Sequence, residues 1–573
     1  MNVDPWELPV LYRSKQQNIR TLVAVLLFGF GLNACTEQPN VEGTATLVVS
    51  GARVWTGNPA QPWAEAVASK GDRIVAVGSS EQVMGLVGPG TRIIQANGGM
   101  LVPGFIDAHV HFTSGGTGLA SVQLRDAATR EEFVDRIASY AGSLAAGEWV
   151  VEGNWDHQNW GGELPTREWI DSVTPNNPVW IYRLDGHMGL ANSVAMELAG
   201  IDADTAEIEG GAIVRDEDGK LTGVFKDNAM ALLAKAIPTP SDAQLDRDVA
   251  AASNFVASHG VTTVHDMSYV GLPELNAYRR ARDSGRLKTR IYAVMPLASW
   301  EVLQEEMVRT GAGDEWVRIG GLKGFMDGSL GSHTAAMLEP FTDSPNDRGF
   351  MLQEPAVMED LVGKADAAGL HVMVHAIGDQ AIRSLLDIYQ RVVDKNGPRD
   401  RRFRIEHAQH IHPDDVPRFA GQDVIASMQP YHAIDDGRWA EDVIGHERSK
   451  TTYAFASLIR SGARVAFGSD WSVAPPTPLE GIYAALTRQT LDGANPDGWV
   501  PEQKITLDQA LTAYTTNAAY ASYEETLKGS LEVGKLADFV LLDKDLSAIP
   551  AEDIAGVRVL QTVVGGQLVF SAD

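Results

Sequence analysis

The chain has 573 residues, of which 44% are hydrophobic and 21% are charged, so it is long enough to bury the core of a large globular domain with appendages. Its formal net charge of -28 argues against nucleic acids and anionic membrane surfaces as partners, because both require clustered Lys and Arg side chains. The excess of acidic side chains is instead typical of a surface that keeps a protein in solution.

The first 40 residues differ in character from the rest. An apolar run at 21–32 follows several basic residues; it is too short to span a bilayer and fits the core of a signal peptide. It ends in Leu32-Asn33-Ala34-Cys35, which resembles a bacterial lipobox. We predict a lipoprotein-type signal peptide and tether over 1–40, lipidation at Cys35, and an exported protein anchored to a membrane of the bacterial cell envelope. The alternative is a buried helix with an incidental cysteine.

Cys35 is the only cysteine of the chain. A disulfide within the chain is therefore excluded, and once Cys35 is lipidated no thiolate remains to bind a metal or attack a substrate.

Short β-rich runs, bounded by Gly or polar turns, occur near both ends of the chain. We expect the N-terminal runs to form a small antiparallel sheet, and residues 41–98 plus 525–573 to form one β-sandwich domain. The expected strands are Ala45–Gly51, Ala52–Trp55, Arg73–Gly78, Ala537–Asp543 and Val557–Gly566.

Between these ends, apolar runs alternate with helix-like stretches such as Leu245–His259, Pro355–Ala368 and Gln380–Val393. This alternation predicts an α/β fold, a distorted (β/α)8 barrel over 99–524. About 150 residues separate the first two strands, which is more than one crossover helix needs, so we expect an inserted subdomain at about 112–248. The expected strands are Leu101–Ile106, Val261–His265, Arg290–Val294, Ile319–Phe325, Leu370–His375, Phe403–His407, Val424–Met428 and Arg464–Gly468.

Polar side chains lie at the carboxyl ends of strands one, four, five, six and eight, where barrel enzymes place their active sites. Imidazoles and a carboxylate suit Zn²⁺ and related ions, and a lysine amine that has reacted with CO₂ becomes a carbamate that can bridge two ions. Each histidine alone could be an ordinary polar contact on a solvated strand face, but their joint placement favours a metal centre. The candidates are His109, His111, Lys323, His375, His407 and Asp470.

These residues carry a resemblance to the amidohydrolase superfamily, and within it to the amidohydrolase-3, YtcJ-like group, from about Thr46 onward. The long insertion fits the group too, with Gly153-Asn154-Trp155-Asp156, Leu164-Pro165-Thr166-Arg167 and Arg183-Leu184-Asp185-Gly186-His187 in place. The other matching motifs are Pro103-Gly104-Phe105-Ile106-Asp107-Ala108-His109-Val110-His111, His375-Ala376-Ile377-Gly378-Asp379, Arg404-Ile405-Glu406-His407-Ala408-Gln409, Gly468-Ser469-Asp470-Trp471 and Gly529-Ser530-Leu531-Glu532-Val533-Gly534-Lys535-Leu536-Ala537-Asp538-Phe539.

The resemblance implies a metal-dependent hydrolase with one or two divalent ions, Zn²⁺ being the expected metal. His109, His111 and Asp470 would hold one ion; a second would be held by His375 and His407, with carboxylated Lys323 between the two. A metal-activated hydroxide would attack the carbonyl, while Asp470 accepts the proton of the water and later delivers it to the leaving amine. Unmodified Lys323 could instead pair with Asp327 or Asp266, which would leave a single-ion site.

In the insertion, Trp155, Asp156, Arg183 and His187 are candidates for the substrate wall. Arg183 and His187 could donate hydrogen bonds to a substrate carbonyl or carboxylate, or could equally be structural donors. Further polar residues near strand ends or loops are expected mostly to orient ligands. They are His265, Asp266, His333, Gln429 and His432.

The predicted activity is therefore hydrolysis of a C–N bond, other than a peptide bond, in a small N-substituted amide or formamide. A cyclic-amide hydrolase or a deaminase on the same scaffold is the enzymatic alternative. From another class, a lipid-anchored solute-binding protein could use the barrel mouth without chemistry, although it would not need a proton acceptor beside the metal. The sequence leaves a homo-oligomer open.

Overall fold

The computed structural model describes residues 43–267 and 271–572. The predicted signal peptide and tether, with Cys35, lie outside these residues. In the described ranges, none of the helices combines the length and the apolar character that a membrane crossing requires.

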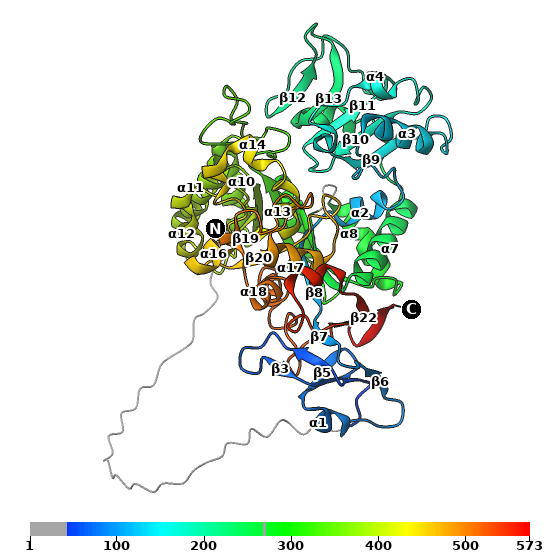
Figure 1. Ribbon diagram of the computed structural model, residues 1–573, viewed down its shortest axis with the longest axis vertical. Helices are drawn as coiled ribbons and strands as arrows, with labels where there is room; N and C mark the ends of the chain where they lie inside the picture. The colour runs from blue at the N-terminus through cyan, green and yellow to red at the C-terminus, as the bar shows by residue number, and fades with distance from the viewer. Residues whose placement is uncertain (1–42, 268–270, 573) are drawn as a thin grey trace, which may run out of the picture. The chain divides into compact units, whose positions relative to one another are not determined.

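Eight parallel strands form the central sheet, in the order in which they follow along the chain (Figure 1). Most of their residues are buried, as expected for parallel strands with helices outside and packed side chains inside. The predicted α/β barrel is thereby confirmed. The strands are β8 (Phe105–Val110), β14 (Val261–Met267), β15 (Arg290–Pro296), β16 (Val317–Phe325), β17 (His371–Ala376), β18 (Arg404–His407), β19 (Ile425–Met428) and β20 (Val465–Phe467).

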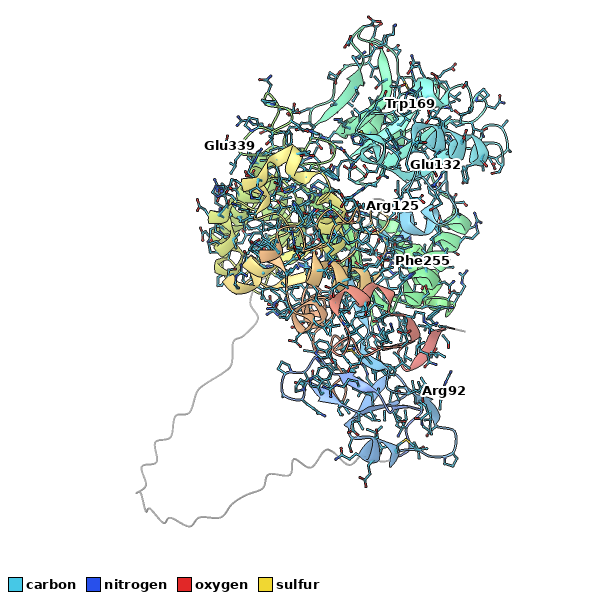
Figure 2. The ribbon with its side chains drawn as sticks, viewed as in Figure 1. Arg92, Arg125, Glu132, Trp169, Phe255 and Glu339 are labelled. Atoms are coloured by element: carbon cyan, nitrogen blue, oxygen red, sulfur yellow. The ribbon has the colours of Figure 1, made fainter. Side chains whose placement is uncertain are left out.

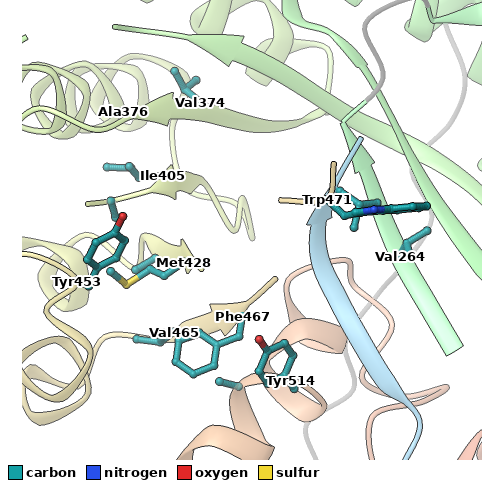
Figure 3. Packing of buried hydrophobic residues seen from close by; sticks show 14 of the residues in the cluster. Val264, Val374, Ala376, Ile405, Met428, Tyr453, Val465, Phe467, Trp471 and Tyr514 are labelled. Carbon is teal, nitrogen blue, oxygen red and sulfur yellow. The ribbon is translucent and has the colours of Figure 1, made fainter. Parts of the chain in front are cut away.

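Amphipathic helices separate the strands along the chain. In α11 (Asp379–Asn396), for example, Ile382, Leu385, Leu386 and Tyr389 recur at helical spacing and are all buried. Figure 3 shows core residues of several successive strands gathered in one cluster, among them Val264, Val374, Ile405 and Val465. The other longer helices between strands are α7 (Asp242–Ser258), α8 (Leu272–Asp283), α9 (Trp300–Thr310) and α10 (Pro355–Ala367), followed by α17 (Pro478–Thr487) after the last strand.

The barrel is distorted where its first and last strands meet. No regular ladder joins β8 to β20 in the described chain; one isolated parallel bridge connects Val110 with Trp471 beyond the end of β20. The connection between α18 (Leu507–Ala513) and α19 (Thr516–Tyr520) fills the gap. The Ile106 amide donates to the Tyr514 carbonyl at 2.8 Å, and the side-chain amide of Asn517 donates to the Val465 carbonyl at 2.9 Å.

Strands from both chain ends form two further sheets, whose facing side chains share a core. The predicted small antiparallel sheet is wrong in detail: β1 and β2 lie in different sheets, and each has a parallel neighbour, β6 and β7 respectively. One sheet has the order β5-β4-β1-β6, with β1 (Leu47–Ser50), β4 (Ala66–Lys70), β5 (Arg73–Gly78) and β6 (Arg92–Gln95). The other has the order β23-β22-β21-β7-β2-β3, with β2 (Arg53–Trp55), β3 (Trp63–Ala64), β7 (Met100–Pro103), β21 (Phe539–Leu542), β22 (Val559–Val564) and β23 (Gln567–Ser571).

The predicted strand Leu101–Ile106 proves to be two strands that serve different sheets. Gly104 separates β7 from β8, and its amide donates to the carbonyl of Asp538 at 3.0 Å. A β-carbon here would lie 2.1 Å from Oγ1 of Thr262, so only glycine allows this close passage from sandwich to barrel.

The segment between β8 and β14 contains a sheet of its own, with the order β12-β13-β11-β10-β9 (Figure 1). Aromatic side chains fill its core: Phe133 packs on Trp155, Trp160 and Trp169, the last of which is labelled in Figure 2. The elements are α3 (Arg130–Ala141), β9 (Val150–Trp155), β10 (Val179–Arg183), β11 (Met188–Ala191), β12 (Gly211–Arg215) and β13 (Leu221–Asp227). The exact domain boundaries stay a prediction.

Candidate metal centre and active site

A cavity that opens to solvent lies where the barrel strands end. Three of the candidate ligands line it: His375 near the end of β17, His407 at the end of β18, and Asp470 just after β20. His109 and His111 lie at the end of β8, and Lys323 lies in β16. The six candidate ligands are therefore carried by strands one, four, five, six and eight, as the strand count predicted.

Four of these side chains converge on one point, with Asp470 at its centre. Oδ1 of Asp470 lies 3.4 Å from Nε2 of His109 and 3.2 Å from Nε2 of His111. Ligand atoms of His109, His407 and Asp470 all lie within 4.8 Å of one another, and all three residues are buried. In this part of the described chain, Nε2 of His109 and Oδ1 of Asp470 are buried without a hydrogen-bond partner.

A divalent ion fits this arrangement. Two nitrogen or oxygen ligands about 2.1 Å from a tetrahedral ion are themselves about 3.4 Å apart, close to the separations found here. Leaving a buried nitrogen and a buried carboxylate oxygen unpartnered would cost about 1 to 3 kcal/mol each, so the unpaired atoms support a missing shared partner. The donor set, imidazoles and a carboxylate, is one that Zn²⁺ accepts.

The two imidazoles on β8 are held by their other ring nitrogens. Nδ1 of His109 lies 2.5 Å from Oε2 of Glu406, whose carboxylate also accepts hydrogen bonds from the buried guanidinium of Arg404 at 2.7 and 3.0 Å. Nδ1 of His111 lies 3.1 Å from the carbonyl of Met267. With a proton on each Nδ1, both Nε2 atoms offer lone pairs to the centre, and burial lowers the pKa of His109, which favours the neutral ring.

His375 and His407 form the other half of the cluster, with their ring centroids 4.6 Å apart. His375 donates from Nε2 to the carbonyl of Gly328 at 2.9 Å, which leaves Nδ1 as its accepting nitrogen. His407 has its Nδ1 2.9 Å from Oε1 of Gln429, which leaves Nε2. Burial lowers the pKa of both rings.

The backbone of His407 adopts a left-handed conformation, with φ of 69°, at the end of its strand. Neighbouring residues on a strand normally face opposite sides, yet both Glu406 and His407 contact the same centre. The conformation turns His407 inward, and such local strain is typical of functional sites.

Lys323 is buried, and its Nζ lies 4.4 Å from the centroid of the Phe325 ring. The expected alternative, an ion pair with Asp327 or Asp266, does not occur: Asp327 accepts from three backbone amides, and Asp266 from the Phe112 amide and the Tyr278 hydroxyl. Burial lowers the pKa of Lys323 to about 8, which increases the share of neutral amine, the form that reacts with CO₂.

Asp470 is suited to remain ionised. Burial by itself would raise its pKa, but the adjoining imidazoles of His109 and His111 outweigh burial and bring the pKa to about 2. The segment that carries Asp470 is held in place by Asp107, whose carboxylate accepts hydrogen bonds from the amide and the hydroxyl of the preceding residue, Ser469, at 2.8 and 2.5 Å.

The four residues predicted for the substrate wall divide into two pairs. Arg183 and His187 line the cavity, and the His187 ring lies 4.8 Å from that of His375. Trp155 and Asp156 are not among the described residues that line it. Trp155 is fully buried in the core of the insertion and donates to the Ile181 carbonyl, while Asp156 lies behind Arg183, 2.9 Å from its Nη2.

The residues expected to orient ligands also differ among themselves. Gln429 contacts His407 directly. His265 accepts a hydrogen bond at 3.0 Å from Arg404, which in turn binds Glu406. His432 lines the cavity, whereas His333 contacts Asp343 in an exposed position. Asp266 holds the backbone amide that follows His111.

Sequence reasoning missed Gln409, Asp436 and Trp439, which also line the cavity. Asp436 ends α13 (Pro430–Asp436), the helix that starts two residues after β19. The available signal was its position directly beyond the seventh barrel strand, where active-site loops of such barrels begin.

Residues 92–570 match the profile of the Amidohydrolase family. The protein LONG AFTER FAR-RED 3 of Arabidopsis thaliana is 37% identical over 537 residues, which cover 92% of each chain. The putative amidohydrolase YtcJ of Bacillus subtilis is 30% identical over 518 residues, 88% of this chain and 96% of that protein. The N-substituted formamide deformylase of Arthrobacter pascens is 30% identical over 545 residues, 91% of this chain and 98% of that enzyme.

Among solved structures, an uncharacterized metal-dependent hydrolase from Pyrococcus horikoshii is similar, with a TM-score of 0.72 and 26% sequence identity. The likeness covers 88% of this chain and 99% of that one.

Proposed function

The chain belongs to the amidohydrolase family, and from this premise we propose that it hydrolyses the C–N bond of a small N-substituted amide, with formamides as the first substrates to test. The observation that carries the proposal is the convergence of Asp470 with His109 and His111 around unpartnered ligand atoms. Similarity to a formamide deformylase along 91% of the chain supports the choice of substrate class.

In the proposed site, His109, His111 and Asp470 would hold one divalent ion, and His375 and His407 would hold a second, with Lys323, if carboxylated, as a further ligand. A bound divalent ion would lower the pKa of water to roughly 7 and polarise a carbonyl oxygen. Asp470, ionised at neutral pH, accepts a proton from water and returns it to the leaving nitrogen. The products are a carboxylic acid, which is formate for a formamide, and an amine.

Two groups of the insertion complete the proposed site. His187 donates from Nδ1 to Asp227 at 2.6 Å. Burial alone would lower the pKa of His187, but Asp227 outweighs burial and raises it, and in the protonated ring Nε2 also carries a hydrogen that can donate to the substrate carbonyl. Arg183 is fixed by Asp156 and Asp185 and borders the same cavity. Both side chains are thus preoriented, which lowers the entropic cost of binding.

Metal analysis of the purified protein, followed by turnover of a panel of N-formyl and N-acyl amines, tests the proposal. We expect one or two divalent ions per chain, together with equimolar release of acid and amine. Ammonia as the nitrogen product would indicate a deaminase, and ring opening without a second product a cyclic-amide hydrolase. Tight binding of the panel without turnover would favour the solute-binding alternative.

We propose further that Cys35 carries a lipid that anchors the exported protein in the cell envelope; the support is the lipobox-like sequence that ends at this residue. Cys35→Ser should move the protein from the membrane fraction to the soluble one. Unchanged membrane retention would contradict the anchor.

A further inference from the structure

The carboxylates of the cavity wall differ in their partners. Asp185 lies 2.6 Å from Nη1 of Arg183, and Asp435 is paired with Arg125 and with Arg438. Asp470 faces His109 and His111. Asp436 is the one cavity-lining carboxylate of the described chain with no Arg, Lys or His nitrogen within 4.0 Å. (Arg125, which reaches this wall from the start of the insertion, is labelled in Figure 2.)

The direct partners of Asp436 are uncharged and both bind the same oxygen. Oδ2 accepts from the Tyr453 hydroxyl at 2.5 Å and from the side-chain amide of Gln409 at 2.9 Å. Oδ1 has no hydrogen-bond partner among the described residues. Burial raises the pKa of this carboxyl to about 7, although the Tyr453 hydroxyl and, from beyond ion-pair distance, the guanidinium groups of Arg183 and Arg438 act to lower it. The carboxylate is therefore only partly compensated within the protein.

Two more features lie on the same turns. His432, one helical turn before Asp436, also lines the cavity, and its Nε2 is buried without a partner. Trp439 follows Asp436 by three residues, donates its backbone amide to the Asp436 carbonyl at 3.0 Å, and lines the cavity as well. A carboxylate, an imidazole nitrogen and an indole ring are together suited to an alkylammonium group.

We propose that Asp436 selects substrates whose amine portion carries a second, positively charged nitrogen, such as N-acylated diamines. This inference rests on the proposed amide hydrolysis and names its substrate class. The ammonium group would bind Oδ1 of Asp436 beside Trp439, while the amide lies at the metal ligands of the same cavity. A charge-assisted hydrogen bond of this kind favours the cationic substrate by about 10- to 100-fold.

A pair of matched substrates tests the inference on the metal-loaded enzyme. N-(4-aminobutyl)formamide and N-pentylformamide have the same length and differ in a terminal ammonium or methyl group. At pH 8 the alkylammonium group remains charged. We expect kcat/KM to favour the cationic formamide at least tenfold, and Asp436→Asn to bring the ratio to about one.

Matched variants separate the charge from its surroundings. Asp436→Glu keeps the charge and should retain a preference for the cation. Asp442→Asn removes the same charge from an exposed site on α14 (Ala440–Ile444) and should leave the ratio unchanged. An asparagine at 436 can still accept from Tyr453 and Gln409, and thermal unfolding verifies that each variant is folded.

Binding of uncleavable probes makes failure of the two proposals distinguishable. N-(4-aminobutyl)methanesulfonamide should bind more tightly than N-pentylmethanesulfonamide in calorimetry, and Asp436→Asn should remove the difference. Equal hydrolysis of both formamides, with equal binding of both sulfonamides, overturns the role of Asp436 and leaves the amidase. Selective binding of the cationic sulfonamide, without hydrolysis of either formamide, supports Asp436 and overturns the amidase.

Discussion

The barrel mouth and the wall supplied by the insertion are both buried and rich in charge, but they use charge differently. At the barrel mouth, Nε2 of His109 and Oδ1 of Asp470 are buried without a hydrogen-bond partner among the described residues. In the wall, Arg183 contacts Asp156, Asp185 and the His157 ring within 3.2 Å. The barrel therefore keeps its charge available for a metal and a reaction, whereas the insertion uses its charge to fix a shape.

The largest expected effect is at the barrel mouth. Asp470→Asn keeps the size of the side chain but removes the proton acceptor, so kcat should fall by about 10²- to 10⁴-fold. The measurement is kcat on the best amide of the panel, with the metal content of the variant determined in parallel. The exposed Asp442→Asn serves as its charge-matched control, and a loss smaller than tenfold would contradict the role of Asp470.

Substitutions in the cavity wall formed by the insertion should lower the stability of the protein. Arg183→Ala leaves Asp156 and Asp185 without their buried partner, which should lower the free energy of unfolding by about 3 to 5 kcal/mol. Denaturant unfolding measures it. Arg558 is 69% exposed beside Asp543, so Arg558→Ala should cost at most about 1 kcal/mol. If both variants lost a similar free energy of unfolding, the buried ion pairs of Arg183 would be no more important for stability than an exposed ion pair.

The support beneath the barrel mouth should have an intermediate effect. Glu406→Gln weakens the hydrogen bond that orients His109, and we expect metal affinity to fall by about 10- to 100-fold. Competition with a chelator measures this affinity without reference to turnover. Glu447→Gln, on an exposed side chain, is the control. An unchanged affinity would mean that Glu406 does not position the ligand.

The smallest effect concerns pH. His371 lies in the barrel interior, hydrogen-bonded to Arg402 and Tyr292, and burial lowers its pKa to about 3. Between this value and the unfolded pKa near 6.5, only the unfolded chain binds the proton, so stability falls as pH falls. His371→Gln should relieve on the order of 2 kcal/mol of this loss at pH 5. Thermal unfolding at pH 7.5 and 5 should therefore differ less than in the wild type, and an unchanged difference would contradict the prediction.

Much of the barrel could be predicted because parallel strands buried on both faces are continuous apolar runs. The predicted strand Phe403–His407, for example, differs from the observed β18 by one residue. The polar residues that end such apolar runs then indicate which end of the barrel carries the site. The boundary at Gly104 could not be predicted, because the apolar residues on both sides form strands; only the contact with Thr262 separates the two sheets.

The wall was harder to predict. Trp155 and Arg183 each end a strand of the insertion, β9 and β10, yet Trp155 is buried in the insertion core and Arg183 borders the cavity. Strand periodicity does not show which face of β9 or β10 meets the barrel, since that depends on packing between distant segments. Asp436 was missed for a related reason: its place in the cavity wall and its contacts with Tyr453 and Gln409 depend on segments that are distant in sequence.

The irregular junction between β8 and β20 has a mechanical consequence. His109 and His111 lie on one side of this junction and Asp470 on the other, so an ion shared by them would link the first and last strands of the barrel. Catalysis and the closure of the barrel would then both depend on the same metal ion.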